Sequence, residues 1–171
     1  GGVSGGGGGS GGGAGDMAAY SRRIALFKQG ARMAKYSRKG KAKAKFVVLT
    51  TEQRGTSARL YWCKDTVSAV NFQKEKEDNF LFLARVVEVR SGKTTDVFKR
   101  KETRALDDSQ CFSIITQDRT LDLMARDRET RDDWVRGLTA AVENMKTLQT
   151  IEVNAASASK SHNTPTGRSL H

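Results

Sequence analysis

A lysine-rich segment holds the side chains best suited to bind a charged ligand. Residues 35–45 read KYSRKGKAKAK, with no acid in eleven positions and six cations: Lys35, Arg38, Lys39, Lys41, Lys43 and Lys45. A glycine between cations favours a hairpin loop, and alternate residues of a strand share one face. Lys41, Lys43 and Lys45 are therefore predicted to point together, with Lys35 opposite them on the partner strand. Ammonium groups act as point charges toward phosphate oxygens, so this geometry predicts a site for a phosphorylated group.

Short β-strands are predicted to position this segment. Runs of β-branched and aromatic residues separated by Gly-containing or charged stretches favour strands over helices. We predict turns at 53–57 and 117–119 and charged loops at 66–79 and 99–109. The predicted strands cover 31–37, a run beginning at Phe46, 58–63, 80–91, 95–98, 111–115 and 121–124.

Two helices are predicted to flank the strands. Tyr20, Ile24 and Phe27 recur at i, i+4 and i+7, which predicts a short amphipathic helix over 19–29 that ends at Gly30. Near the other end, Asp127 is a suitable cap for a helix over about 128–147. Its apolar stripe should face the core; it consists of Trp134, Leu138, Ala141, Val142 and Met145.

The two ends of the chain have compositions that disfavour folding. Residues 1–18 are rich in glycine and predict a flexible linker, and residues 149–171 are small and polar and predict a disordered tail. The domain is therefore expected over 19–148, long enough to bury a core. No run of 18 apolar residues exists, so no membrane-spanning helix is expected.

The composition narrows the function classes. A formal net charge of +11 favours a polyanionic partner, which could be nucleic acid, an anionic membrane or an acidic protein surface. Cys63 and Cys111 lie in apolar runs and are expected to be free, packed thiols in a reducing cytoplasm. His162 and His171 lie in the polar tail without metal-ligand spacing, and no catalytic triad or carboxylate pair stands out. We therefore expect no metal, no cofactor and no enzymatic activity.

Seven strands followed by a helix with one tryptophan in its first turns resemble the pleckstrin homology domain. The likeness is closest to the phospholipase C delta-type branch: residues 89–94 resemble its V-R-x-G-x-T segment, and 111–115 and 120–123 resemble its C-F-S-I and T-L-D-L strands. The resemblance covers residues 24–143. It implies a mainly β fold, a seven-stranded sandwich or barrel of two near-orthogonal antiparallel sheets, closed by the C-terminal helix.

The resemblance also implies a lipid head-group site. In such domains the contacts come from the end of the first strand, the following loop and the start of the second strand. These positions correspond here to Lys35, Arg38, Lys41, Lys43 and Lys45, with Lys64 after the third strand and Thr120 before the seventh.

The segment also departs from the family pattern. Ser37 replaces a second cation of the first strand, and Lys41 replaces the loop tryptophan that touches the membrane. Lysines also replace guanidinium groups on the second strand, which removes bidentate clamping. These changes favour weaker stereospecificity and a larger general electrostatic contribution, so phosphatidic acid becomes a candidate beside a bisphosphorylated inositide.

The predicted function is a non-catalytic adaptor that binds anionic phospholipid head groups at the cytosolic face of a membrane. The alternative is a protein-interaction scaffold with the same fold. The acylated single-domain pleckstrin homology proteins of parasites, which this chain resembles, are precedents for both. Nucleic-acid binding ranks last, because Tyr36 is the only aromatic residue among the cations of the basic segment.

Overall fold

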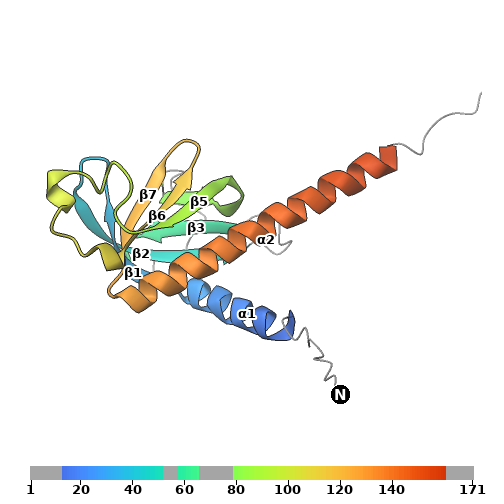
Figure 1. The fold of residues 1–171 in the computed structure, drawn as a ribbon, viewed down its shortest axis with the longest axis horizontal. Helices are drawn as coiled ribbons and strands as arrows, with labels where there is room; N and C mark the ends of the chain where they lie inside the picture. The colour runs from blue at the N-terminus through green and yellow to red at the C-terminus, as the bar shows by residue number, and fades with distance from the viewer. Residues whose placement is uncertain (1–12, 52–57, 66–78, 161–171) are drawn as a thin grey trace, which may run out of the picture.

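The computed structural model describes residues 13–51, 58–65 and 79–160 (Figure 1). The predicted turn at 53–57 and nearly all of the predicted loop at 66–79 lie outside the described residues. The same is true of residues 1–12 and of residues 161–171, which include both histidines.

Within the described residues, seven strands form one antiparallel sheet in the order β4-β3-β2-β1-β7-β6-β5. Pairing of β1 with β7 joins the strands of the first half of the chain to those of the second. The architecture confirms the predicted seven antiparallel strands with a C-terminal helix and a short N-terminal helix. The strands are β1 (Ala31–Tyr36), β2 (Ala42–Thr51), β3 (Ala58–Cys63), β4 (Phe80–Phe82), β5 (Val86–Ser91), β6 (Cys111–Thr116) and β7 (Thr120–Met124).

One hydrophobic core is shared by all seven strands and both helices, so the sheet must curl around it. The strand residues of this core include Met33, Val47, Leu60, Leu81, Val86, Phe112 and Leu123. Because strand residues alternate between faces, each strand sends every second side chain into this core and leaves the others on the outer face.

Helix α2 (Arg128–Lys160) closes the core. Its cap is as predicted, since the Asp127 carboxylate accepts a 2.7 Å hydrogen bond from the Thr130 amide. Trp134 is 4% exposed and packs in the core with Leu138, Ala141 and Val142, as predicted. Met145, the last residue of the predicted stripe, is only partly buried. Within the described residues no helix is both long and apolar enough to cross a membrane.

Both helices are longer than predicted. Helix α2 continues past residue 147 to Lys160, so part of the predicted tail is helical and projects from the domain in Figure 1. No glycine or proline occurs between Gly137 and Lys160 to end it. Helix α1 (Gly13–Gln29) begins before residue 19 and ends at Gly30, whose φ of +75° favours glycine.

The strand predictions need correction between residues 80 and 98. The 3-10 helix η3 (Leu83–Arg85) divides the predicted fourth strand into β4 and β5, with Leu83 turned into the core. Residues 95–98, predicted as a strand, form a turn in which the Phe98 amide donates to the Thr95 carbonyl at 3.1 Å. Val97 and Phe98 are both buried in one cluster, and consecutive residues of a strand could not share a face in this way.

Candidate anion-binding site

The pairing of β1 with β2 brings three of the predicted lysines to one face of the sheet. Lys35 lies directly opposite Lys43, and Lys45 is paired with Met33, whose side chain is in the core. The three lysines therefore lie on the core-facing side of the hairpin, and Lys35 and Lys43 lie nearer its turn than Met33 does. Lys35 and Lys45 are partly buried, and Lys43 is exposed.

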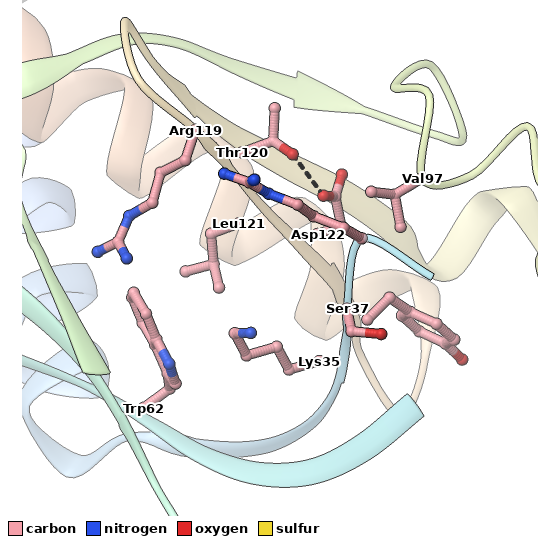
Figure 2. A pocket seen from close by; sticks show the side chains of 10 residues that line it. Lys35, Ser37, Trp62, Val97, Arg119, Thr120, Leu121 and Asp122 are labelled. Carbon is pink, nitrogen blue, oxygen red and sulfur yellow. Dashed lines mark hydrogen bonds between the residues drawn. The ribbon is translucent and has the colours of Figure 1, made fainter. Parts of the chain in front are cut away.

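An indole ring lies beneath two of the cations of this site. The Lys35 Nζ atom is 5.6 Å from the centre of the Trp62 ring, and the Arg119 Cζ atom is 5.1 Å from it. Figure 2 shows both side chains reaching toward Trp62, Lys35 from β1 and Arg119 from the turn before β7. Both contacts fall within the range of cation–π attraction, which partly offsets the repulsion between the two charges.

A cavity of about 250 Å³ opens beside this pair of cations. It forms beyond the Tyr36–Asp122 pair, where the pairing of β1 with β7 ends. The predicted site residues Lys35, Arg38 and Thr120 line the cavity together with Arg119, Ser37, Trp62, Leu121, Asp122, Tyr36 and Val97. Three cations from three segments of the chain thus surround a space large enough for a phosphate group.

The turn between β1 and β2 is closed by hydrogen bonds at Ser37. Its amide donates to the Lys41 carbonyl at 2.9 Å, and its hydroxyl accepts from the Lys41 amide at 3.2 Å. These bonds hold Arg38 at the rim of the cavity, while Lys41 is exposed on the hairpin and does not line it.

The electrostatic environment of Lys35 is unfavourable for its charge. Burial lowers the pKa of its ammonium group below the ordinary lysine value, and the cations Lys45, Arg119 and Lys43 lower the pKa further, against an opposing effect of Asp122. A bound anion would relieve both penalties. The site is therefore arranged to gain from accepting negative charge.

Asp122 is the acidic residue of this site, and three hydroxyl groups donate hydrogen bonds to its carboxylate. The carboxylate is 1% exposed and accepts hydrogen bonds from Thr95 at 2.5 Å, Ser113 at 2.7 Å and Thr120 at 2.6 Å. The Thr120 hydroxyl therefore donates to Asp122 (dashed in Figure 2), and in this arrangement its proton is not available to a phosphate oxygen.

The predicted residues are only partly brought together. Lys64 is exposed in the bend after β3 and does not line the cavity, and Lys43 and Lys45 stand beside it rather than in its wall. Sequence reasoning missed Arg119, which we assigned only to a tight turn, and Trp62. The one available signal for Arg119 was its position directly before Thr120.

The described residues contain no cluster of three His, Cys, Asp or Glu side chains that could hold a metal ion. Cys63 and Cys111 are buried free thiols, as predicted from their apolar surroundings. Burial raises the pKa of the Cys111 thiol to about 11.

A seven-stranded antiparallel sheet closed by a C-terminal helix is the architecture of a pleckstrin homology domain. The family model for the pleckstrin homology domain matches residues 19–143, and the chain belongs to this family. Domains of this family commonly bind lipids or proteins and are generally non-catalytic.

Solved structures of similar fold come from several organisms. The crystal structure of S. officinalis PLC21 is 18% identical (TM-score 0.48), covering 68% of this chain, which spans only 15% of that protein. Inner Membrane Complex Sub-compartment Protein 1 from Toxoplasma gondii is 14% identical (TM-score 0.46), with 74% of this chain and 92% of that one covered. The C-terminal domain of human pleckstrin is 20% identical (TM-score 0.45), with 68% and 87% covered. No curated protein matches the chain.

Proposed function

We propose that this chain is a non-catalytic membrane-targeting adaptor that binds the phosphorylated head group of an anionic phospholipid at the cavity beside the β1–β2 hairpin. The observation that carries the proposal is the set of cations Lys35, Lys43, Lys45 and Arg119 gathered at one end of the core. Among the described residues, no salt bridge joins Lys35, Lys43 or Lys45 to an acid.

The arrangement of these groups suggests how the head group would bind. Its phosphate would lie over Lys35 and Arg119, where Trp62 supports both cations from below. Lys43 and Lys45 would approach from β2 and Arg38 from the hairpin turn, while Lys41 and Lys64 would contribute long-range attraction only. Because the Thr120 hydroxyl is bound to Asp122, it would position the turn that carries Arg119 rather than donate to the ligand.

The chemistry of the cations bears on the choice of lipid. The hairpin offers ammonium groups, which bind phosphate oxygens as point charges, and Arg119 offers a guanidinium whose Nη2 also donates to the Phe80 carbonyl. A terminal phosphomonoester satisfies this set, so the candidates are phosphatidic acid and a phosphoinositide of the kind bound by phospholipase C delta-type domains. The bound state would lie at the cytosolic face of a membrane, and a second membrane anchor such as an acyl chain would make the attachment stable.

Co-sedimentation with vesicles tests the proposal. Neutral phosphatidylcholine vesicles are compared with vesicles that also contain phosphatidic acid, phosphatidylinositol bisphosphate or, at matched charge, phosphatidylserine. The variant Lys35→Ala/Lys43→Ala/Lys45→Ala is compared with Arg22→Ala/Lys28→Ala/Arg32→Ala, which removes the same charge from α1 and the far end of β1.

Selective pelleting on a phosphomonoester lipid that only the first variant abolishes would support the site. Equal pelleting of both variants on every anionic vesicle would leave only nonspecific charge attraction. No pelleting of the wild type at low salt would reject lipid binding.

A second candidate function, a protein-interaction scaffold, is favoured by a separate surface. On the outer face of β3 and β4, Arg59 lies over the rings of Phe80 and Phe82 at 5.4 and 4.9 Å, and Arg85 lies over Phe82 at 5.4 Å. Both rings are only partly buried. Arginine and aromatic residues are enriched in protein interfaces. Pull-down of a protein that Phe82→Ser/Arg85→Ser releases, with vesicle binding unchanged, would establish this function.

A further inference from the structure

A serine hydroxyl lies at the rim of the cationic cavity. The hydroxyl-bearing residues that line the cavity are Tyr36, Ser37 and Thr120. The Tyr36 hydroxyl donates to the Met124 sulfur at 3.7 Å, and the Thr120 hydroxyl donates to the Asp122 carboxylate. The Ser37 hydroxyl accepts from the Lys41 amide at 3.2 Å, and among the described residues no acceptor is found for its proton. Of these three hydroxyls, only that of Ser37 is therefore free to react.

The position of Ser37 exposes it to an enzyme. It directly follows β1 and begins the turn to β2, and Figure 2 shows it on the strand that also carries Lys35. The Ser37 side chain is only partly buried, and Arg38 and Lys39, the next two residues, are exposed. In Figure 1 this hairpin lies at the end of the domain opposite to the projecting part of α2, so neither helix covers it.

Cations flank Ser37 on both sides in the sequence. Lys35, Arg38, Lys39 and Lys41 lie within four positions of it, and no acid does. Within residues 13–51, 58–65 and 79–160, no other serine or threonine combines four such cations with the absence of an acid. The nearest acids in space are otherwise placed: Glu102 approaches the turn at Gly40, and Asp122 accepts three hydroxyl hydrogen bonds.

A phosphate on Ser37 would be received by positive charge that is already in place. Burial and the cations Lys45 and Arg119 lower the pKa of the Lys35 ammonium, so a negative group beside it is favourable. A phosphoserine carries between about 1.5 and 2 negative charges at neutral pH and three acceptor oxygens. Because Ser37 and Arg38 both line the cavity, this group would lie at the cavity rim among these cations.

The same phosphate would exclude a lipid head group. The cavity has a volume of about 250 Å³, and Ser37 forms part of its wall. A second phosphate entering it would meet the first at short range, and like charges in a partly buried site repel strongly. Lys35 and Arg119 would also already be neutralised. Modification at this position would therefore remove both the space and the charge that the head group needs.

We propose that Ser37 is a phosphorylation site, whose phosphate takes the place of the phospholipid head group and releases the domain from the membrane. The inference rests on the proposed lipid binding. The modifying enzyme is a protein kinase that favours basic substrates, because an acidic substrate groove complements Lys35, Arg38 and Lys39.

The transfer is an ordinary phosphoryl transfer from Mg·ATP. Ser37 Oγ forms a bond to the γ-phosphorus, and the bond from that phosphorus to the β–γ bridging oxygen breaks, so ADP leaves. The hydroxyl proton passes to a carboxylate of the kinase. No other co-reactant is needed.

The test compares the full chain carrying genetically encoded phosphoserine at position 37 with the chain carrying it at position 21. Ser21 is exposed on α1 beside Arg22 and Arg23, so the control adds the same charge next to cations away from the cavity. On phosphatidylcholine vesicles containing phosphatidic acid or phosphatidylinositol bisphosphate, phosphorylation at 37 is expected to weaken binding on the order of 10- to 100-fold relative to phosphorylation at 21. The protein phosphorylated at 37 should melt no lower than the unmodified chain.

A second measurement asks whether the folded chain accepts the modification. The wild type is incubated with Mg·ATP and protein kinase A or C, and mass spectrometry locates the phosphate. Phosphate is expected on Ser37 and should be absent from that peptide in Ser37→Ala.

Each failure has its own meaning. If the unmodified chain binds vesicles and both phosphorylated chains bind them equally, the inference is wrong while lipid binding stands. If the unmodified chain binds no vesicles, the proposed function fails and the inference fails with it. A melting temperature several degrees below that of the unmodified chain would show that the cavity does not receive the phosphate. Absence of phosphate on Ser37 with every kinase would show that the hydroxyl is out of reach, and would also reject the inference.

Discussion

At the scale of single residues, Lys35 shows how binding and stability oppose each other. Its charge is partly buried beside other cations, so its pKa is lowered in the folded protein. Between the folded and unfolded pKa values the folded state binds fewer protons, and the free energy of unfolding therefore rises as pH rises through that window. At neutral pH the charged ammonium lowers the free energy of unfolding, and a bound anionic ligand would reduce this loss of stability.

Lys35→Met is therefore expected to weaken vesicle binding about 10- to 100-fold, the loss typical of one charged contact. The same variant should melt no lower than the wild type, because the apolar chain keeps its contact with Trp62 and the buried charge is removed. Calorimetric melting and co-sedimentation provide the two measurements, with Lys28→Met on α1 as the control. A melting temperature several degrees below that of the control variant would contradict the argument.

Asp122 is the second residue whose role is sharply defined. Asp122→Asn retains one acceptor oxygen and replaces the other with an amide that cannot accept from a hydroxyl. Three donors then compete for one oxygen in a buried position, and a loss of about 1–3 kcal/mol in the free energy of unfolding is expected. Urea denaturation measures it. Asp118→Asn in the exposed turn nearby should change stability little, and equal losses in the two variants would argue against the hydroxyl network.

At the scale of elements, the contact between α1 and α2 depends on a glycine inside a helix. A Cβ atom at Gly137 would lie 2.2 Å from Cζ of Phe27. The Phe27 side chain is fully buried, and its ring is tilted against that of Trp134 with 4.7 Å between the ring centres. Alanine favours a helix by about 1 kcal/mol over glycine, but overpacking costs about 1–3 kcal/mol.

Gly137→Ala is accordingly expected to lower the melting temperature despite its better helix propensity. Arg136→Ala, at the preceding exposed position of the same helix, should leave it nearly unchanged. Scanning calorimetry measures the melting temperatures of both variants. A more stable Gly137→Ala protein would show that α2 does not pack closely against Phe27 of α1 at this position.

Burial of Cys111 in the cluster between the 92–110 segment and β6 predicts a loss of stability at alkaline pH. Since the pKa of Cys111 is raised to about 11, the folded protein retains a thiol proton that the unfolded chain has lost, and this contribution to stability disappears as pH rises from about 9 to about 11. The wild type should lose up to about 2–3 kcal/mol more than Cys111→Ala over that range. Parallel stability curves, measured by urea denaturation at each pH, would contradict this.

At the scale of the whole molecule, the distribution of charge decides how attachment responds to salt. The net charge is +11, and much of it is collected on and beside the β1–β2 hairpin. Raising the ionic strength from about 0.01 to about 0.1 M shortens the screening length from roughly 30 to roughly 10 Å.

Binding to phosphatidylserine vesicles should therefore fall by on the order of tenfold or more over that range of salt. Binding to phosphatidic acid or phosphatidylinositol bisphosphate should fall less, because the partly buried cations beside Trp62 are screened less than exposed ones. Vesicle titrations at the two ionic strengths measure both responses. The same salt dependence for all anionic lipids would indicate that the cavity takes no part in binding.

Local sequence patterns determined the fold class and the cationic hairpin. Period-two runs around Phe46, Leu60 and Ile114 predict strands, and the stripe through Trp134 and Leu138 predicts the closing helix, because these patterns depend only on which side chains must leave water. The sequence also predicts that Lys35 and Lys43 lie opposite each other, because strand residues alternate between faces and the turn is at Gly40.

Tertiary structure alone decided which residues complete the site. Arg119 reaches Trp62 because curling of the sheet brings the turn before β7 over the end of β3, and residues 57 positions apart in the chain give no local signal of that contact. The turn at Val97 and Phe98 has the same cause: a strand would expose one of the two, and only the outer face of β1 and β6 provides a surface that buries both. Burial of side chains between segments distant in sequence, rather than local propensity, shaped both the cavity and the segment beside it.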